Sequence, residues 1–220
     1  MKNLIYFLVI AGTIVVILSG NIILEYLNST PPIVMDNSTQ FQEVGEANTF
    51  QTTENLKLFL EKPQIEPSSA SIKIYKELRV LELYGDEILI GRFKIALGGN
   101  PIGDKNQEGD SKTPEGQYYI CTRNDRSKYT LFLGLSYPNI EDAQRGLKNE
   151  LIDEEIFNIV KYANEHKQRP PWDTPLGGAV GIHGKGNAYD WTLGCIALSD
   201  EDIKVLWDYT SLKTPVEIFK

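Results

Sequence analysis

Residues 71–97 read SIKIYKELRVLELYGDEILIGRFKIAL, and this stretch sets the fold class. Three runs within it, 71–75, 79–84 and 87–97, are rich in Ile, Leu, Val, Tyr and Phe, which favour β-strands. Gly85 and Asp86 stand between the second and third runs, where they predict the tight turn of a hairpin. The stretch therefore predicts a β-meander.

Downstream of the meander the pattern predicts more strands and then helices. Further strands are expected at 118–121 and 129–135, and an amphipathic helix is expected over 150–167, before the Arg-Pro-Pro stop at 169–171. The remaining expected elements are a strand at 179–183, a helix from Ser199 to about Tyr209 and a strand at 216–219. We therefore expect a mainly β domain with packed helices, of the α+β class, over residues 70–220.

The N-terminal segment predicts a membrane anchor. Residues 3–24 contain no charged residue, and as a helix they are long enough to cross the roughly 30 Å hydrocarbon core of a bilayer. The cleavage pattern is weak, so a retained anchor or uncleaved signal is expected over residues 1–27. Lys2 precedes the apolar run and Glu25 follows it, which predicts a single pass through the cytoplasmic membrane with the remainder extracytoplasmic, on the periplasmic or cell wall side. Residues 28–69, rich in polar residues and Pro, are expected to form a linker.

The composition excludes several classes of function. Lys and Arg total 22 against 30 Asp and Glu, a net charge of -8, so the basic surface that nucleic-acid binders need is missing. The chain has two cysteines and two histidines, too few for a disulfide framework or a zinc site without carboxylate ligands. No nucleic acid, metal or other cofactor is expected. Cys121, within a strand-like run, is expected to be an inert thiol.

One pair of residues carries candidate chemistry. A cysteine attacks carbonyl groups as a thiolate, and an unperturbed thiol is a few per cent ionised at neutral pH, so Cys195 needs a neighbouring base. His183, twelve positions earlier, is the candidate base, and Gly194 allows a sharp turn whose N–H groups point at a developing oxyanion. The spacing alone is equally compatible with a small buried cysteine beside a core histidine.

Two motifs resolve that ambiguity through a resemblance. Ile182-His183-Gly184 followed by Leu193-Gly194-Cys195-Ile196 resembles the His-Gly and Ser-x-Gly-Cys-Ile/Val signature of the L,D-transpeptidase catalytic domain, the YkuD-like family of peptidoglycan-modifying cysteine enzymes. Residues 109–116, GDSKTPEG, are similar to the family's Gly-Asp-x-x-Thr-Pro-x-Gly segment. The likeness covers residues 70–220 in the family's order of elements.

The resemblance implies a β-sandwich or cradle with a cysteine acyl-enzyme mechanism on peptidoglycan stem peptides. Cys195 is implied as nucleophile, His183 as base, the Gly184 carbonyl as the group that orients the imidazole, and the N–H groups of Gly194 and Cys195 as oxyanion donors. Thr192 keeps the family's Ser/Thr position, whereas Ala197 stands where Arg is common and helps to bind the stem.

Further residues are assigned to substrate binding on weaker grounds. Residues 135–139 with Asp142, Arg145 and Gly146 resemble a subgroup that includes hydrolases detaching wall-anchored lipoproteins. Arg145 is expected to pair with a stem carboxylate and Tyr137 to stack along the peptide, against the alternative of a Pro turn and a solvated Arg. Trp191, on the loop between the two motifs, is expected to line the cleft or to pack.

Three functions remain open at this point. The first is a membrane-anchored L,D-transpeptidase that forms cross-links or attaches acceptors to the wall. The second is a thiol hydrolase of the same fold, either an L,D-carboxypeptidase or an enzyme releasing a wall-linked lipoprotein. The third is a non-catalytic wall-binding module, suggested by Ala197 and a short interval between His183 and Cys195.

Overall fold

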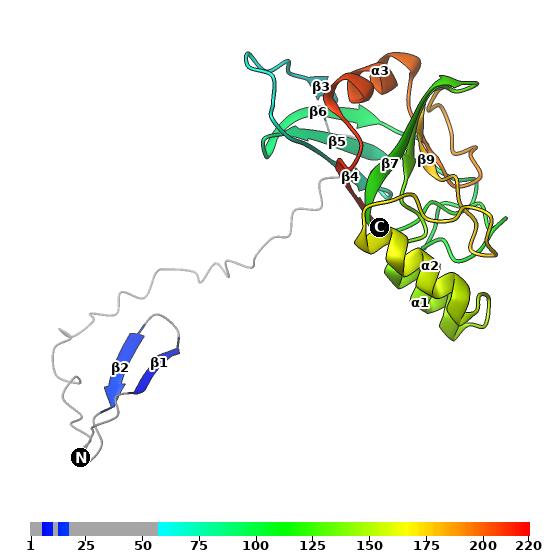
Figure 1. Ribbon diagram of the computed structural model, residues 1–220. Coiled ribbons are helices and arrows are strands. Elements are labelled where there is room, and N and C mark those ends of the chain that lie inside the picture. Colours follow the sequence, from blue (N-terminus) through cyan, green and yellow to red (C-terminus); the bar gives the residue numbers. More distant parts are fainter. Residues whose placement is uncertain (1–5, 11–12, 18–56) are drawn as a thin grey trace, which may run out of the picture. The chain divides into compact units, whose positions relative to one another are not determined.

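The computed structural model describes residues 6–10, 13–17 and 57–220, drawn in colour in Figure 1. The chain divides into two units, Met1–Thr49 and Phe50–Lys220, which we describe separately. In the first unit, β1 (Tyr6–Ile10) and β2 (Thr13–Ile17) pair antiparallel, with Tyr6 opposite Ile17. The structure thus has strands where the sequence predicts a membrane helix.

The membrane anchor expected over 1–27 is therefore not shown. Among the helices within the described residues, none is both long and apolar enough to cross a bilayer. The remainder of the expected anchor and most of the expected linker lie outside the described residues.

The second unit is built on one nine-stranded sheet with the order β10-β9-β8-β7-β11-β4-β5-β6-β3. Its strands are β3 (Phe59–Leu60), β4 (Ala70–Tyr75), β5 (Val80–Gly85), β6 (Ile88–Lys94), β7 (Gly116–Ser127), β8 (Thr130–Leu135), β9 (Gly181–His183), β10 (Ile196–Ala197) and β11 (Pro215–Phe219). The predicted meander is confirmed, because β4, β5 and β6 pair antiparallel in sequence order. The C-terminal strand β11 lies between β4 and β7, so the sheet joins the two ends of the domain.

The turn of the meander lies one residue later than predicted. Gly85 pairs with Ile88, and the two loop residues Asp86 and Glu87 have φ of 47° and 68°. A two-residue hairpin with both central residues at positive φ has the twist that suits antiparallel strands. The Asp86 carboxylate also accepts the N–H groups of Ser68 and Ser69, at 3.0 and 2.9 Å, which anchors the start of β4 to this turn.

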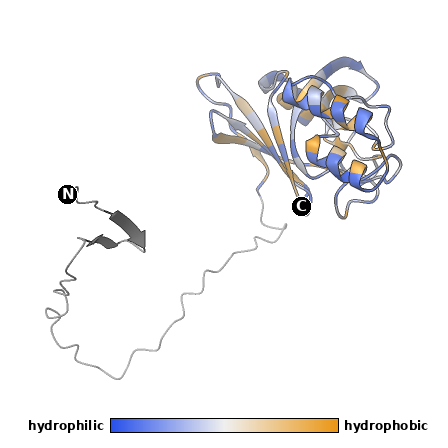
Figure 2. Ribbon diagram, turned by 60° about the horizontal axis from the view of Figure 1, so that its bottom comes forward, coloured by the Kyte–Doolittle hydropathy of each residue, from blue (hydrophilic) through white to orange (hydrophobic). Residues whose placement is uncertain are grey.

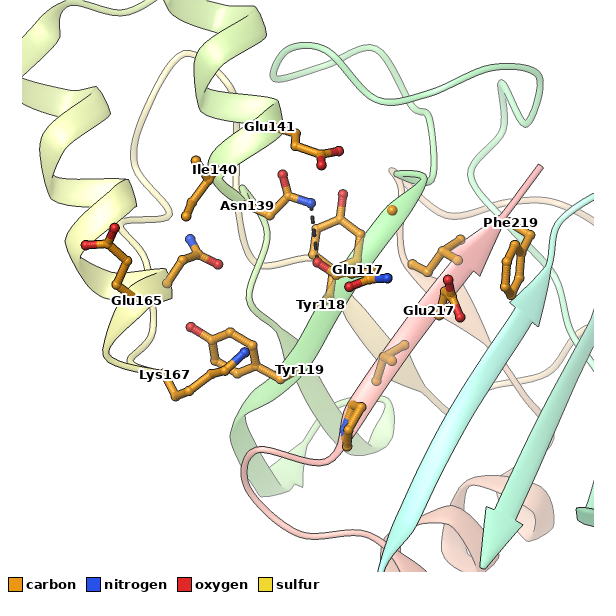
Figure 3. Close-up of a pocket in the computed structure, with 15 residues that line it drawn as sticks. Gln117, Tyr118, Tyr119, Asn139, Ile140, Glu141, Glu165, Lys167, Glu217 and Phe219 are labelled. Atoms are coloured by element: carbon orange, nitrogen blue, oxygen red, sulfur yellow. Dashed lines mark hydrogen bonds between the residues drawn. The ribbon is translucent and has the colours of Figure 1, made fainter. Parts of the chain in front are cut away.

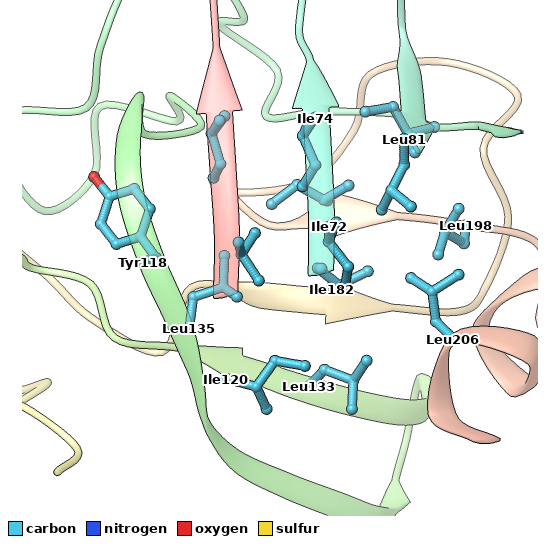
Figure 4. Close-up of a cluster of buried hydrophobic side chains, with 14 of the residues drawn as sticks. Ile72, Ile74, Leu81, Tyr118, Ile120, Leu133, Leu135, Ile182, Leu198 and Leu206 are labelled. Carbon is cyan, nitrogen blue, oxygen red and sulfur yellow. The ribbon is translucent and has the colours of Figure 1, made fainter. Parts of the chain in front are cut away.

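The sheet curls around one core instead of forming the two layers of a sandwich. Ala96, just after β6, bridges to Ala197 of β10, and Gly98 bridges to Thr192, so strands near opposite edges of the sheet meet. Inward-facing side chains from both halves share a single cluster, shown in Figure 4, that includes Ile72, Leu81, Leu133 and Ile182. The predicted cradle is correct and the sandwich is not.

Three helices complete the unit: α1 (Ile140–Lys148), α2 (Glu154–Glu165) and α3 (Asp200–Tyr209). The helix expected over 150–167 is α2, capped at its start by Asp153, and the predicted cap Ser199 accepts the Asp202 N–H at 3.0 Å. In Figure 2 these helices carry hydrophobic residues in bands between hydrophilic ones, the pattern of helices that bury one face. Helix α3 packs on the main core, whereas α1 and α2 share a smaller cluster with Leu176.

Candidate active site

The two candidate catalytic residues lie on neighbouring parallel strands. Strands β9 and β10 pair with Ile182 opposite Ile196 and His183 opposite Ala197. Cys195 stands directly before β10, two positions from Ala197 along the strand. Cys195 therefore stands next to the strand that pairs with the strand of His183.

The turn that presents Cys195 is held by one hydroxyl group. Oγ1 of Thr192 accepts the Gly194 N–H at 3.1 Å and donates to the Cys195 carbonyl oxygen at 2.7 Å. Gly194 has φ of +135°, and a Cβ placed there would lie 2.7 Å from the Lys112 carbonyl oxygen. This position therefore requires glycine, for its backbone conformation and for the close approach of another chain segment.

These contacts change two of the expected roles. Thr192, expected to bind substrate, is 4% exposed and uses its hydroxyl within the turn. Its bond to the Gly194 N–H occupies one of the two expected oxyanion donors. Among the residues that the structure describes, no backbone acceptor pairs with the Cys195 N–H, which leaves that group as the oxyanion donor of the turn.

The Cys195 thiol is protonated at neutral pH. The side chain is half-buried, and its Sγ donates to the Ala179 carbonyl oxygen at 3.6 Å. Burial raises the pKa of Cys195 to about 11, although a hydrogen bond from the Gly181 backbone and the positive charge of Lys105 both act to lower it. An unassisted thiolate is therefore scarce, and the thiol requires a base to react.

His183 has the properties of that base. Its Nδ1 lies 2.7 Å from the Gly184 carbonyl oxygen, the contact that the resemblance predicts. A carbonyl oxygen can only accept, so Nδ1 carries the proton and Nε2 presents its lone pair in the neutral ring. Burial lowers the pKa of His183, and the neutral form therefore dominates at pH 7.

Aromatic rings enclose this imidazole. His183 is 1% exposed, stacks on Tyr129 with ring centroids 4.5 Å apart, and meets the edge of Trp191 at 5.7 Å. Trp191 donates its indole N–H to the Gly186 carbonyl oxygen at 3.1 Å, so it packs beside the catalytic base. Within the described part of the chain, no hydrogen bond joins the His183 ring to Sγ of Cys195.

The carbonyl that orients His183 is itself anchored. The Gly184 N–H donates to the Tyr129 carbonyl oxygen at 3.0 Å, and the Lys185 N–H donates to Oδ1 of Asp200 at 2.9 Å. The same Asp200 oxygen accepts from the Thr130 hydroxyl at 2.6 Å. A Cβ at Gly184 would lie 2.4 Å from Asp200 Oδ1, so this approach also requires glycine.

Two residues expected to bind substrate have structural contacts instead. Tyr137 is fully buried and donates its hydroxyl to the Leu176 carbonyl oxygen at 2.9 Å, so it cannot stack on an external peptide. Arg145 forms ion pairs through Nη2 with Asp104 at 2.9 Å and Asp142 at 2.7 Å, while its side chain remains 33% exposed. The stacking expected of Tyr137 does not fit its burial, whereas the substrate role expected of Arg145 stays a prediction.

Three residues near the site were not predicted. Tyr129 and Asp200 hold the His183-Gly184 segment, and the Lys105 side chain lies near Gly194, directly before Cys195. For Lys105 a signal was available, because it precedes the recognised GDSKTPEG segment by four residues in the same glycine-bounded loop. Cys121 is a free thiol whose pKa burial raises to about 12, in agreement with the inert role expected for it.

A large pocket, or hollow, lies apart from Cys195 and His183. It has a volume of about 790 Å³ and opens between α1, α2, β7 and β11, as Figure 3 shows. Asn139, Lys167 and Glu217 line it, whereas neither Cys195 nor His183 does. The hollow is therefore separate from the candidate site at Cys195 and His183.

This chain is similar in part to several known proteins. The YafK protein of Escherichia coli (strain K12) is 33% identical over 98 residues, which cover 41% of this chain and 39% of that protein. Among solved structures, the helical cell shape determining protein Pgp2 from Campylobacter jejuni has 23% identity and a TM-score of 0.47, covering 69% of this chain and 48% of that one. Bd1075 from Bdellovibrio bacteriovorus has 25% identity and a TM-score of 0.44, covering 74% and 54%.

The family model gives the broadest match. The match to YafK spans well under half of that relative's length. The model of the L,D-transpeptidase catalytic domain, YkuD, matches residues 69–218, which is more than half of this chain. The chain therefore belongs to the YkuD family of L,D-transpeptidase catalytic domains.

Proposed function

We propose that the second unit is a cysteine acyltransferase that acts on peptidoglycan stem peptides and expels the terminal D-Ala. The observation that carries this proposal is the 2.7 Å hydrogen bond from Nδ1 of His183 to the Gly184 carbonyl oxygen, which leaves Nε2 free to act as a base on the strand that pairs with the one after Cys195. Membership of the family supports the substrate class.

The first half-reaction forms a thioester. The Cys195 thiol leaves the Ala179 carbonyl, gives its proton to Nε2 of His183, and Sγ attacks the amide carbonyl carbon at the L-centre of the stem diamino acid. The Cys195 N–H donates to the oxyanion of the tetrahedral intermediate. Collapse breaks the C–N bond, and the imidazolium returns the proton to the departing amine of D-Ala.

The second half-reaction regenerates the enzyme. An acceptor amine or a water molecule loses a proton to Nε2 of His183 as it attacks the thioester carbonyl. The C–S bond breaks and the proton returns to Sγ. An amine acceptor yields a cross-link, whereas water yields a tripeptide, so the acceptor alone separates transpeptidase from hydrolase.

The test is mass spectrometry of tetrapeptide muropeptides after incubation with the full chain in reducing buffer. Release of D-Ala with formation of cross-linked dimer or tripeptide is expected, and Cys195→Ala is expected to abolish both products. Cys121→Ala removes the other thiol and is expected to leave the rate unchanged, since that thiol is remote from the mechanism. Turnover that survives Cys195→Ala, or no product from the unmodified protein, contradicts the proposal.

A second substrate tests the hydrolytic alternative. Sacculi carrying covalently linked lipoprotein are incubated with the same proteins, and the soluble fraction is analysed for released protein. Release that requires Cys195, without cross-linked dimers in the first assay, assigns the hydrolase reaction. Binding to sacculi that is equal for the unmodified chain and Cys195→Ala, without products, assigns a wall-binding module.

We also propose that the uncharged N-terminal run over residues 3–24 anchors the chain in the cytoplasmic membrane. The support is its length and its lack of charge. Protease treatment of intact spheroplasts is expected to digest the catalytic unit from outside. Protection of that unit in spheroplasts, with digestion after lysis, contradicts this orientation.

A further inference from the structure

A buried lysine lies beside the nucleophile and has no place in the mechanism above. The Lys105 side chain is 2% exposed, and its Nζ donates to the Gln107 carbonyl oxygen at 2.9 Å and to Oδ1 of Asp110 at 2.8 Å. An ammonium group has three donors. Within the described residues, the third N–H of Lys105 has no hydrogen-bond partner, and the cation lies 5.8 Å from the centroid of the Tyr137 ring.

The loop that carries Lys105 packs directly against the turn of Cys195. A Cβ at Gly194 would lie 2.7 Å from the Lys112 carbonyl oxygen and 4.0 Å from Cδ of Lys105. On the other side, a Cβ at Gly177 would lie 3.4 Å from Cε of Lys105. The aliphatic stem of Lys105 thus passes between Gly177 and Gly194, next to the nucleophile.

The other charged groups around this lysine are either paired or exposed to solvent. Asp110 accepts from Lys105 and also from the N–H groups of Asn106, Gln107 and Lys112, so its negative charge is shared among four donors. Glu108 lies near Gly177 and is exposed to solvent. Arg145 contacts the backbone carbonyl of Lys105, and its own charge is paired with Asp104 and Asp142.

We propose that Lys105 is a positioning residue whose ammonium stabilises the Cys195 thiolate at the moment when His183 removes the proton. The inference rests on the proposed function, because it assigns Cys195 as the nucleophile. Asp110 holds the ammonium in place through Nζ and organises the loop backbone around it. In a buried site, a neighbouring cation favours the ionised form of a thiol.

Alkylation of Cys195 by iodoacetamide tests this proposal without any substrate. The full chain is treated between pH 7 and 9.5, and the modification of each cysteine peptide is followed by mass spectrometry. In Lys105→Met we expect alkylation of Cys195 to slow about threefold or more, since a pKa raised by about one unit cuts the thiolate tenfold while the remaining thiolate is more nucleophilic. Cys121 is the internal reference, and its rate is expected to stay unchanged.

A second buried lysine provides the matched control. Lys76 is also 2% exposed and anchors the same loop, donating to the carbonyl oxygens of Gly103 and Thr113 and to Glu115 at 2.7, 2.8 and 2.8 Å. All three of its donors are used, and it does not act on the pKa of Cys195. Lys76→Met is therefore expected to leave the alkylation rate of Cys195 unchanged where the protein remains folded by circular dichroism.

A third variant distinguishes the effect of the Lys105 charge from the effect of loop structure. It also provides a test in case Lys105→Met does not fold. Asp110→Asn keeps an oxygen that can accept from Nζ of Lys105 and removes the negative charge that opposes it, so alkylation of Cys195 is expected to accelerate. A slowing in Asp110→Asn, an unchanged rate in Lys105→Met, or an equal slowing in Lys76→Met overturns the proposal in favour of a purely structural loop. Because no muropeptide is present, these outcomes are independent of whether the acyl transfer itself occurs.

Discussion

Removal of the Thr192 hydroxyl tests whether this one group holds the turn that presents Cys195. Thr192→Val keeps the shape of the side chain and deletes two hydrogen bonds, one from the Gly194 N–H at 3.1 Å and one to the Cys195 carbonyl at 2.7 Å. The site is 4% exposed, so water cannot replace the hydroxyl freely. An unsatisfied buried polar group costs about 1–3 kcal/mol, so the two groups together are expected to cost about 3 kcal/mol of unfolding free energy.

The assay is urea unfolding followed by circular dichroism, with thermal unfolding alongside. A loss of about 3 kcal/mol corresponds to a fall in Tm of about 6–12 °C in a domain of this size. We expect kcat to fall as well, because the turn that positions the Cys195 N–H and Sγ loses the two hydrogen bonds that hold it. Thr192→Ser, which retains the hydroxyl, is the matched control and is expected to keep most of both properties.

Two results would refute this reasoning. A Thr192→Val protein of unchanged stability whose KM alone rises would assign the hydroxyl to substrate binding, as the sequence first predicts. Equal losses in Thr192→Val and Thr192→Ser would show that the methyl packing, and not the hydroxyl, supports the turn.

Three further predictions concern the base and the buried polar contacts. The neutral form of His183 is the active base and exists above a pKa that burial lowers, so kcat/KM is expected to rise with pH through that pKa and stay level from pH 7 to 9. A rate that keeps rising above pH 9, toward the Cys195 pKa of about 11, would instead indicate attack by a thiolate formed without the base. Arg145→Met removes the partner of the buried Asp142 carboxylate. The free energy of unfolding is expected to fall by about 2 kcal/mol, a value reduced to allow for the partial exposure of the guanidinium, and KM is expected to stay unchanged. A raised KM without loss of stability would instead support a substrate role for Arg145. Tyr137→Phe deletes the hydrogen bond to the Leu176 carbonyl and is expected to lower the free energy of unfolding in urea by about 1 kcal/mol, with kcat/KM unchanged. A changed kcat/KM at equal stability would instead place the ring in the substrate site.

Local patterns accounted for much of the fold. Strands β4, β5 and β6 follow from the β-favouring residues of 71–97 and from the turn residues between them, because strand propensity and hairpin turns depend on near neighbours in sequence. The cap of α3 at Ser199 follows from side-chain chemistry within three residues. The two catalytic candidates were likewise visible as a short motif.

Contacts between distant segments account for what the sequence did not predict. The insertion of β11 between β4 and β7 and the bridge from Ala96 to Ala197 join residues about a hundred positions apart or more, and no local periodicity encodes such pairings. The burial of individual side chains also depends on contacts between distant segments. Tyr137 was expected at the surface from its own segment, but it packs in the main core and its hydroxyl donates to the Leu176 carbonyl oxygen, 39 positions away.

The chemistry of the site likewise depends partly on residue identity and partly on tertiary packing. Residue identity alone provides a thiol, an imidazole and a glycine turn, since these are properties of single side chains and of adjacent positions. Whether the thiol is protonated, which imidazole nitrogen carries hydrogen and which cation lies beside the nucleophile depend on the Gly184 carbonyl, the desolvation of Cys195 and the approach of the Lys105 loop. These are fixed by the packing of segments remote in sequence, because electrostatic energies in a protein depend on distance and burial in space and not on separation along the chain.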